Sequence, residues 1–367
     1  MSARMKAAVF VANNEPLVME DLKLDPPGAN EVHVKWSATG VCHSDVSIWN
    51  GTLPIPAPCI LGHEGAGVVV AAGQNRWGFK KGDHVIGSFI PTCGECFYCK
   101  NGQAFVCAKS IEIGMGRMPF TRPDGSRLMG AVGGLASFSP ETVVHEAAIV
   151  KIPQEFPLHQ ASLLGCGVTT GVGAALFAAK VKPGSTCAVI GCGGVGLAAI
   201  QGCRIAGAKQ IIAIDLNPAK RKAAEEFGAT HSFDPAESDA VNTVKEMTEG
   251  RGADFAFEVV GNTKLQRQAY DMTRPGGVCC WVGIPNMMEE VSVPAAMIAL
   301  ESKSIVGTLY GSANVRTDFV KLIELVKKGE LELEKMVSRR IKIEEINDAF
   351  RAMLEGEVIR SVVVYDA

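Results

Sequence analysis

Short apolar runs broken by turn residues occupy the first part of the chain, and no helical period is sustained there. The turn sequence Asp25-Pro26-Pro27-Gly28 separates the first two runs. The apolar content predicts strands over Lys6–Val11, Glu31–Ala38, Val68–Ala72 and His84–Phe89. This pattern predicts a partly open antiparallel β domain.

From about Ser185 the pattern changes to buried strands that alternate with helices. The predicted strands are Cys187–Ile190, Gln210–Ile214, Phe255–Val260, Val278–Gly283 and Ser304–Tyr310. One helix is predicted from the glycine-rich turn after the first of these strands to about Ala206. Further helices are predicted over Pro218–Phe227, Val241–Thr248, Lys264–Thr273, Asp318–Lys328 and Ile346–Glu355. A closing strand is predicted over Arg360–Val364. Strand–helix alternation at this spacing predicts a doubly wound parallel sheet of the α/β class.

Composition narrows the class of protein. A chain of 367 residues is long enough for two domains. The net charge of -3 provides neither a basic field for nucleic acid nor a polybasic membrane patch. The uncharged run Ala161–Ala179 contains four glycines and two threonines, so we expect a loop and a buried helix rather than a membrane span. The N-terminus shows no signal-peptide pattern, and we expect a cytoplasmic protein.

The coenzyme signal is the pattern G-x-G-x-x-G at Gly191, Gly193 and Gly196, which follows a predicted strand and opens a helix. Such glycines permit a tight turn and close approach of a pyrophosphate, which the N–H groups of the helix N-terminus can bind. Asp215 ends the next strand, where a carboxylate binds the adenosine ribose and repels a 2′-phosphate. The aspartate therefore favours NAD over NADP. The alternative to a coenzyme site is a glycine-rich turn with a capping aspartate and no ligand.

A second signal is the run of four cysteines Cys93-x₂-Cys96-x₂-Cys99-x₇-Cys107. Four thiolates can surround one zinc ion tetrahedrally and leave no open position. An iron–sulfur cluster would use the same ligands. A nucleic-acid-binding zinc ribbon would need surrounding basic residues, and Lys100 is the only one within the run. A structural zinc lobe is the preferred interpretation, and twelve cysteines without an export signal favour metal ligands and free thiols over disulfides.

The third signal is spread over the chain. His63 lies in Gly62-His63-Glu64-Gly65, Cys42 lies upstream, and Cys166 lies in a glycine-rich segment before the coenzyme strand. Two thiolates and one imidazole form the three-ligand set of a catalytic zinc site with an open fourth position. Taken singly, His63 could be a structural histidine and Cys166 a small buried apolar residue. The cysteines outside these sets are also interpreted as small buried apolar residues.

These residues together resemble, over essentially the whole chain, the zinc-dependent alcohol dehydrogenases of the medium-chain dehydrogenase/reductase superfamily. The similarity is strongest to the branch with catalytic and structural zinc, which includes class I and class III enzymes. The motifs that carry it are Gly-Val-Cys42-His43-Ser44-Asp45, Gly62-His63-Glu64, the four-cysteine run, Leu-Gly-Cys166-Gly and Gly191–Gly196. The resemblance implies a GroES-like catalytic domain over 1–167 and 311–367 with a structural-zinc lobe at 93–107, and a Rossmann NAD-binding domain over 168–310.

The resemblance also implies residue roles. Cys42, His63 and Cys166 would hold the catalytic zinc. Asp45 would orient His63, and Glu64 would lie behind the metal as a transient ligand. The implied coenzyme contacts are His43, Thr170, Gly191, Gly193, Gly194, Val195, Gly196, Asp215, Lys220 and Arg360. The implied substrate cleft is lined by Leu53, Phe89, Ile284 and Leu309.

The chain departs from the family pattern in places. Ser44 would accept the alcohol proton, but Ser47 stands where many relatives have the histidine that passes this proton to solvent. Arg76 stands where a small or aliphatic residue is usual, and we expect it to be a surface change that touches no metal ligand. The segment 107–139 is compact beside that of longer-looped relatives, which bears on substrate choice.

The function implied is hydride transfer between a primary alcohol or its aldehyde and NAD, in a homodimer or, alternatively, a tetramer, without nucleic-acid or membrane partners. One alternative is oxidation of a thiol adduct such as S-(hydroxymethyl)glutathione, for which Arg117, Arg122 and Arg127 would supply positive charge. Another is a catalytically silent nucleotide-binding or structural relative.

Overall fold

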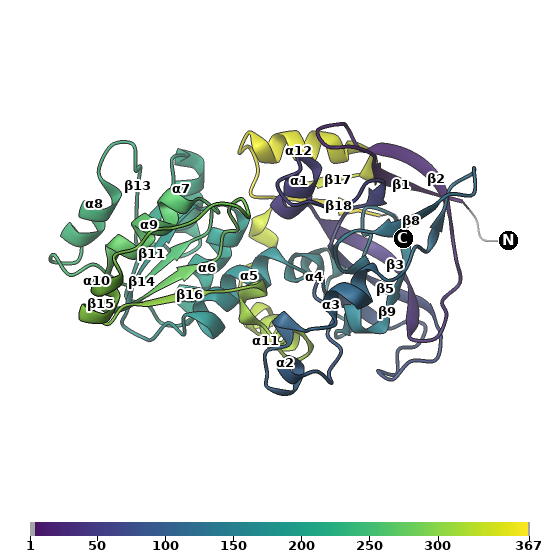
Figure 1. The fold of residues 1–367 in the computed structure, drawn as a ribbon, viewed down its shortest axis with the longest axis horizontal. Coiled ribbons are helices and arrows are strands. Elements are labelled where there is room, and N and C mark those ends of the chain that lie inside the picture. Colours follow the sequence, from purple (N-terminus) through teal and green to yellow (C-terminus); the bar gives the residue numbers. More distant parts are fainter. Residues whose placement is uncertain (1–3, 366–367) are drawn as a thin grey trace. The chain divides into compact units, whose positions relative to one another are not determined.

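The computed structural model describes residues 4–365, which form two compact units (Figure 1). One unit comprises residues up to 166 together with 314–328 and 333 onward, and the other comprises 167–313 and 329–332. The division expected from the sequence placed 167, 311–313 and 329–332 in the first unit. Both predicted metal clusters therefore lie in the first unit, and the glycine-rich turn lies in the second.

The first unit contains a closed barrel with the strand order β1-β2-β7-β8-β4. These strands are β1 (Met5–Phe10), β2 (Val18–Leu24), β4 (Cys59–Ile60), β7 (Phe120–Thr121) and β8 (Arg127–Gly130). Large side chains including Phe10, Phe120 and Phe138 fill its core. The ring of strands closes because β4 pairs with both β1 and β8, whereas the sequence pattern predicted a partly open antiparallel β domain and the family resemblance a partly open barrel.

A second sheet in the same unit has the order β10-β6-β5-β3-β18-β17, with β9 also pairing with β3. Its strands are β3 (Glu31–Gly40), β5 (Glu64–Ala72), β6 (His84–Gly87), β9 (Glu141–His145), β10 (Ile149–Lys151), β17 (Val337–Ile341) and β18 (Arg360–Val364). Buried and half-buried residues alternate along most of β3, as a strand with one face on the core requires. Gly40 of β3 pairs with Glu64 of β5 and with Val362 of β18, so residues distant in sequence meet at this end of the sheet.

The described α-helices of the first unit range from four to 13 residues in length. They are α1 (His43–Trp49), α2 (Phe97–Lys100), α3 (Ser110–Met115), α4 (Leu158–Leu164), α11 (Val315–Lys327) and α12 (Ile346–Leu354). Single 3₁₀ turns cover Ala104–Val106, Val132–Gly134, Glu146–Ala148, Glu334–Met336 and Ile343–Glu345. Helices α11 and α12 confirm those predicted over Asp318–Lys328 and Ile346–Glu355. Helices α2 and α3 and the short strands β4, β7 and β8 were not predicted, because their few residues carry no sustained periodicity.

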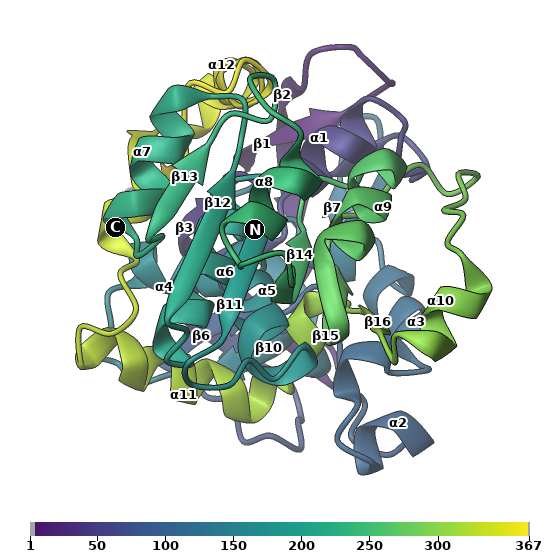
Figure 2. The same cartoon turned by 90° about the vertical axis from the view of Figure 1, so that its left-hand side faces the viewer.

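The second unit is built on a parallel sheet with the order β13-β12-β11-β14-β15-β16 (Figures 1 and 2). Its strands are β11 (Thr186–Ile190), β12 (Gln210–Ile214), β13 (His231–Phe233), β14 (Ala253–Glu258), β15 (Thr273–Trp281) and β16 (Ser304–Gly307). The chain runs outward from β11 to β13 and then crosses to β14. The strand order therefore reverses between β11 and β14, and ligands of such sheets bind at the carboxyl ends beside this point.

Helices connect these strands and confirm the predicted doubly wound sheet. They are α5 (Gly167–Gly173), α6 (Gly194–Ile205), α7 (Pro218–Glu226), α8 (Ala240–Glu246), α9 (Thr263–Met272) and α10 (Ala295–Leu300), with a π-helical turn at Ala174–Ala178 and a 3₁₀ turn at Tyr310–Ser312. The last strand stops at Gly307 rather than Tyr310, because the 3₁₀ turn follows it.

Within residues 4–365, no single helix is both long and apolar enough to cross a membrane. A bent pair, Leu158–Leu164 with Gly167–Ala178, meets the length and composition criteria only when its two helices are counted together.

Candidate functional site

A buried cluster of metal-binding side chains lies in the first unit. Ligand atoms of Cys42, His63, Glu64 and Cys166 all lie within 4.8 Å of one another, and the two sulfurs are 3.9 Å apart. Cys42 is the N-cap of α1, Glu64 begins β5, and Cys166 follows α4. The fold therefore brings together the three ligands that the sequence suggested, with Glu64 beside them.

Gly62 makes the turn into this cluster possible. Its φ of +85° lies in the left-handed region, and a Cβ there would come within 2.5 Å of the Phe138 backbone nitrogen. The glycine of the Gly62-His63-Glu64 motif is therefore required by backbone geometry. His63 follows it directly and is almost completely buried.

Asp45 fixes the cluster from the first turn of α1. Its Oδ1 accepts hydrogen bonds from His63 Nδ1 and the Gly62 backbone N–H, both at 3.0 Å, and Oδ2 accepts the Cys42 N–H at 3.3 Å. The Asp45 side chain is fully buried. Because Nδ1 carries the proton shared with Asp45, Nε2 of His63 is the atom left to bind a metal ion.

Charges in the cluster reinforce one another. Burial acts to lower the pKa of His63, but Asp45 and Cys42 outweigh it and raise that pKa to about 10. The hydrogen bond from Cys166 lowers the pKa of Cys42, with a smaller contribution from His63, against the opposing effect of burial. Both pKa shifts favour the charged forms of these side chains, a thiolate at Cys42 and an imidazolium at His63. Binding of a zinc ion would displace the imidazolium proton.

Behind the cluster, Glu64 forms a buried ion pair with Arg360 of β18. The Nε of Arg360 is also buried and has no partner among the described residues. Arg360 was predicted to contact the coenzyme pyrophosphate, and in this structure its guanidinium contacts the Glu64 carboxylate. The pyrophosphate contact stays a prediction.

The other residues predicted for proton transfer, coenzyme contact and the substrate cleft have different surroundings. Ser44 and Ser47 are half-buried on α1, and His43 is exposed. The Phe89 ring packs edge-on against the His63 ring, with centroids 5.7 Å apart. Leu53 packs against the barrel core. Ile284 and Leu309, which were also predicted to line the substrate cleft, belong to the second unit and are exposed.

The four-cysteine lobe forms a second cluster in the first unit. Ligand atoms of all four cysteines lie within 4.8 Å of one another, with Cys93–Cys99 and Cys96–Cys107 sulfurs 3.9 and 4.0 Å apart. Tetrahedral Zn–S bonds of about 2.3 Å place sulfurs about 3.8 Å apart, whereas a disulfide bond joins sulfurs at about 2.0 Å. All four thiols are free, so the spacing fits a zinc ion and not disulfides.

Backbone N–H groups already face these sulfurs. Cys93 Sγ accepts the N–H groups of Glu95 and Cys96 at 3.4 and 3.3 Å, and Cys107 Sγ accepts the Cys93 N–H at 3.3 Å. Such donors stabilise sulfur in its anionic, metal-binding form. The lobe is therefore preorganised for thiolate ligands.

Arg76 corrects one expectation from the sequence. Its guanidinium donates to the carbonyl of Cys93 and, at 2.8 Å, to Glu95, so the residue contacts the metal lobe directly rather than being a bare surface change. The buried Glu146 carboxylate accepts the Arg76 backbone N–H at 2.7 Å. The guanidinium also lies 5.0 Å from the ring centroid of Trp77. Sequence reasoning missed this contact because Cys93 and Glu95 are 17 and 19 residues from Arg76 along the chain, beyond the reach of any local pattern.

Arg316 completes this attachment. Its guanidinium lies 3.6 Å from the centroid of the Trp77 ring, close enough for a strong cation–π contact, and its Nε donates to Thr92 Oγ1 at 3.1 Å. Burial and the nearby Arg76 charge lower the pKa of Arg316 to about 10, so it remains charged at neutral pH. Helix α11 is thereby fixed next to the start of the lobe.

In the second unit, the glycine-rich turn lies between β11 and α6. Gly191 has φ +94°, and a side chain at Gly196 would collide with the Gly191 carbonyl. A Cβ at Gly193 would meet nothing within 4 Å, so this glycine faces open space. Gly194 and Val195 follow it as the half-buried first residues of α6. The turn therefore fits a pyrophosphate at a helix N-terminus.

Asp215 lies directly beside this turn. Its Oδ2 accepts the Cys192 N–H at 2.7 Å, and its Oδ1 accepts the Asn217 N–H at 2.8 Å. Asn217 caps α7 by accepting the N–H groups of Ala219 and Lys220. The carboxylate is thus anchored to the turn, as an adenosine-binding aspartate should be. Thr170, another predicted coenzyme contact, is half-buried on α5.

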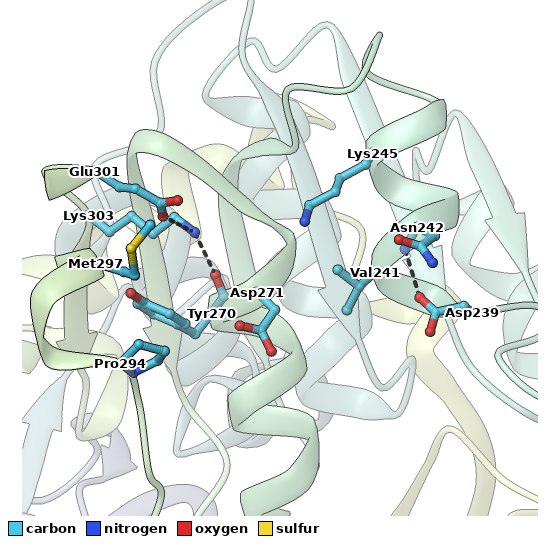
Figure 3. Close-up of a pocket in the computed structure, with 10 residues that line it drawn as sticks. All are labelled: Asp239, Val241, Asn242, Lys245, Tyr270, Asp271, Pro294, Met297, Glu301 and Lys303. Carbon is cyan, nitrogen blue, oxygen red and sulfur yellow. Dashed lines mark hydrogen bonds and ion pairs between the residues drawn. The ribbon is translucent and has the colours of Figure 1, made fainter.

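A separate hollow of about 420 Å³ in the second unit contains none of the predicted site residues (Figure 3). Lys303 lies on one side, where it pairs with Glu301 and approaches the Tyr270 ring, and Lys245 lies on the other. The Tyr270 hydroxyl is buried without a partner among the described residues. Positive and negative side chains are mixed around the hollow, so it favours no single ligand charge.

Comparison with known proteins agrees with this geometry. The family described as "Alcohol dehydrogenase GroES-like domain" matches residues 28–154, and "Zinc-binding dehydrogenase" matches 194–328. The chain is 39% identical to "Alcohol dehydrogenase class-3" of Drosophila melanogaster, over 98% of this chain and 97% of the relative. It is 38% identical to "NDMA-dependent alcohol dehydrogenase" of Amycolatopsis methanolica, over 99% of this chain and 100% of the relative.

Solved structures give the same result. The crystal structure of benzyl alcohol dehydrogenase from Acinetobacter calcoaceticus superposes with a TM-score of 0.92 at 29% identity, covering 99% of both chains. An alcohol dehydrogenase zinc-binding domain protein from Burkholderia ambifaria superposes with a TM-score of 0.94 at 31% identity, also covering 99% of both. The chain belongs to the zinc-dependent alcohol dehydrogenases of the medium-chain dehydrogenase/reductase superfamily.

Proposed function

We propose that this protein transfers hydride between a primary alcohol or its aldehyde and NAD at a zinc site formed by Cys42, His63 and Cys166. The observation that carries the proposal is the buried cluster of these three ligands with a histidine whose free nitrogen is set by Asp45. Two thiolates and one imidazole match the ligand set that catalytic zinc uses when one position is kept for substrate. Glu64, the fourth group, has its charge balanced by Arg360.

The bound groups would divide the chemistry between them: zinc supplies Lewis acidity toward the substrate oxygen, and NAD accepts or returns the hydride. The chain's own residues orient and move protons. Asp45 holds the imidazole so that only Nε2 faces the cluster. Ser44 would accept the substrate hydroxyl proton. Ser47, also on α1, replaces the relay histidine of many relatives, so the proton would pass from Ser44 to water.

A second zinc ion would bind the four-cysteine lobe. All four donors there are thiols, so no ligand position remains for substrate and this metal would be structural. The sulfur spacing and the N–H donors support zinc over disulfides. Metal analysis of the purified protein tests this proposal: two zinc ions per chain are expected, and iron with visible absorption would identify an iron–sulfur cluster instead.

NAD is the proposed coenzyme because Asp215 carries a fixed negative charge beside the glycine-rich turn. A 2′-phosphate would be repelled there. The NDMA-dependent relative makes the mode of coenzyme use an experimental question: the coenzyme either exchanges in each turnover or stays bound to the protein. Release of NAD from heat-denatured, extensively dialysed protein would identify a resident coenzyme.

The glutathione-adduct alternative has less support in this structure. Its recognition would need free cationic side chains, but Arg117 pairs with Glu31, Arg122 pairs with Glu20, and Arg127 donates to an aspartate. We therefore propose simple primary alcohols as substrates. Formaldehyde oxidation with and without glutathione distinguishes the two: equal rates support the proposal, and activity that requires glutathione overturns it.

The proposed assembly is a homodimer. Light scattering of the purified protein tests it, and the mass of a tetramer would correct it. The activity itself is tested with a panel of primary alcohols and aldehydes, using NAD and NADP in parallel. Turnover with NAD that disappears after removal of zinc is the expected result, and absence of turnover in zinc-loaded protein would favour a catalytically silent relative.

A further inference from the structure

In the second unit, an ion pair between Arg221 and Asp234 lies next to Asp215, the proposed adenosine-binding residue. Arg221 is in the first half of α7, and Asp234 follows β13, the strand next to β12. Arg221 Nη1 donates to Asp234 Oδ2 at 2.9 Å. Both side chains are largely buried, with 19% and 17% of their surface exposed. The guanidinium is therefore held in place rather than free in solvent.

The same nitrogen also binds the backbone that carries Asp215. Arg221 Nη1 donates to the carbonyl oxygens of Asp215 and Leu216, each at 2.8 Å. Asp234 is itself fixed, since its Oδ1 accepts the Ala236 N–H at 2.9 Å. The backbone of the Asp215 segment is thus held by Arg221 of α7, and Arg221 is in turn held by Asp234, which follows β13.

The Asp215 side chain is fixed from the opposite direction, by the backbone N–H groups of Cys192 and Asn217. Two sets of hydrogen bonds therefore converge on one residue: the glycine-rich turn holds its carboxylate, and Arg221 holds its carbonyl. Because the side chain and the backbone of Asp215 are already held, less conformational entropy is lost when a ribose binds.

The pair has a second consequence for coenzyme choice. An arginine near this end of the second strand is the residue with which related sheets accept a 2′-phosphate. Here Arg221 Nη1 donates to three acceptors within the protein, and Asp234 neutralises the charge of the guanidinium. An arginine is thus present close to the adenosine site but is committed elsewhere.

We propose that Arg221 and Asp234 act as a positioning pair that makes this enzyme select NAD over NADP. Arg221 holds Asp215 in its ribose-binding position, and Asp234 keeps the guanidinium from serving a 2′-phosphate. The inference rests on the proposed use of a nicotinamide coenzyme. Selection between NAD and NADP is usually attributed to the aspartate of the motif alone. Here Arg221 and Asp234, which lie outside the motif, also contribute to it.

The test measures dissociation constants of NAD and NADP by calorimetry, with no turnover required. Arg221→Met should weaken NAD binding about tenfold, since charge-assisted hydrogen bonds to the Asp215 segment are lost, and should give NADP no advantage. Asp234→Asn should release the guanidinium charge and lower the ratio of the NADP to the NAD dissociation constant about tenfold. Lys222→Met, which removes an exposed charge from the same helix, is the matched control and should change neither constant.

The outcomes separate the two proposals. If the unaltered protein binds neither dinucleotide, the proposed function fails. If it binds NAD but both variants keep its NAD affinity and its NADP-to-NAD ratio within about twofold, the positioning pair is refuted and the function stands. Equal losses in Arg221→Met and Lys222→Met would show a general charge effect and would also refute it. Thermal melting of each variant identifies any that fails to fold, and Arg221→Lys then replaces Arg221→Met.

Discussion

The two thiol clusters of the first unit differ in how they are assembled. All ligands of the lobe come from Cys93–Cys107, whereas Cys42, His63 and Cys166 come from α1, the start of β5 and the end of α4. In the lobe the sulfurs receive backbone N–H groups from the same loop. In the other cluster the ligands contact side chains: Asp45 accepts a hydrogen bond from His63, and Arg360 forms an ion pair with Glu64.

Burial also separates them. Cys96 and Cys99 of the lobe are partly exposed, whereas Cys42, His63, Glu64 and Cys166 are all buried. A local loop that closes around metal needs little from the rest of the fold, so its ligands can lie at the surface. A site assembled from distant segments exists only once the fold has formed, and the surrounding protein then controls its charges. The first arrangement suits a structural metal and the second suits chemistry.

Removing a ligand from the buried cluster would have the largest effect on activity. Cys42→Ala or His63→Ala should reduce turnover to background, because two ligands do not hold a catalytic zinc. NAD binding should persist, since the glycine-rich turn and Asp215, which are predicted to hold the pyrophosphate and the adenosine ribose, belong to the second unit. Steady-state kinetics, zinc analysis and NAD calorimetry check this, and substantial turnover in either variant would contradict the proposed site.

Removing a ligand from the lobe should affect stability before chemistry. Cys96→Ser should lose one zinc ion per chain and lower the melting temperature markedly, because the binding free energy of a structural zinc is part of the folding free energy. Residual activity per catalytic zinc should be close to that of the unaltered protein at low temperature. If activity is lost while both the zinc content and the melting temperature are retained, the lobe has a catalytic role and the comparison fails.

Changing the support of the buried cluster should have an intermediate effect. Asp45→Asn keeps the shape but weakens the acceptor for His63 Nδ1, and the loss of such a carboxylate costs about 10–100-fold in zinc affinity or activity. Zinc titration against a chelator and kcat measure the two quantities. An exposed acid such as Glu355, changed to Gln, is the control and should alter neither. Unchanged values in Asp45→Asn would mean that backbone geometry alone orients the imidazole.

The smallest effect is expected at the attachment of the lobe. Arg76→Met removes the hydrogen bonds to the Cys93 carbonyl and Glu95 from a partly exposed side chain, so zinc release from the lobe to a chelator should accelerate by about tenfold or less. Release from the buried cluster should keep its rate. Arg351→Met, which removes a surface ion pair with Glu355, serves as control. Equal release rates in Arg76→Met and the unaltered protein would leave Arg76 with no role in metal retention.

Much of the fold was predictable because its signals are local or periodic. The alternation of strands and helices from Thr186 onward and the turn at Gly191–Gly196 follow from neighbouring residues, and the structure confirms this doubly wound sheet. The short strands β4, β7 and β8 were missed. Strands of two to four residues carry too little pattern, and their pairing depends on partners elsewhere in the chain.

The candidate sites show the same division. The sequence by itself determined the lobe, whose four sulfurs are forced together by their spacing, and the coenzyme turn, whose glycines and aspartate act over a short stretch. It named Cys42, His63 and Cys166 as a candidate ligand set from their residue types and from a family resemblance, because nothing in their spacing brings them together. Only the tertiary structure decided that these three meet, that Arg76 binds the lobe rather than solvent, and that Arg221 supports Asp215. The physical reason is that such contacts join segments whose distance in space is set by strand pairing and core packing, which spacing along the chain does not encode.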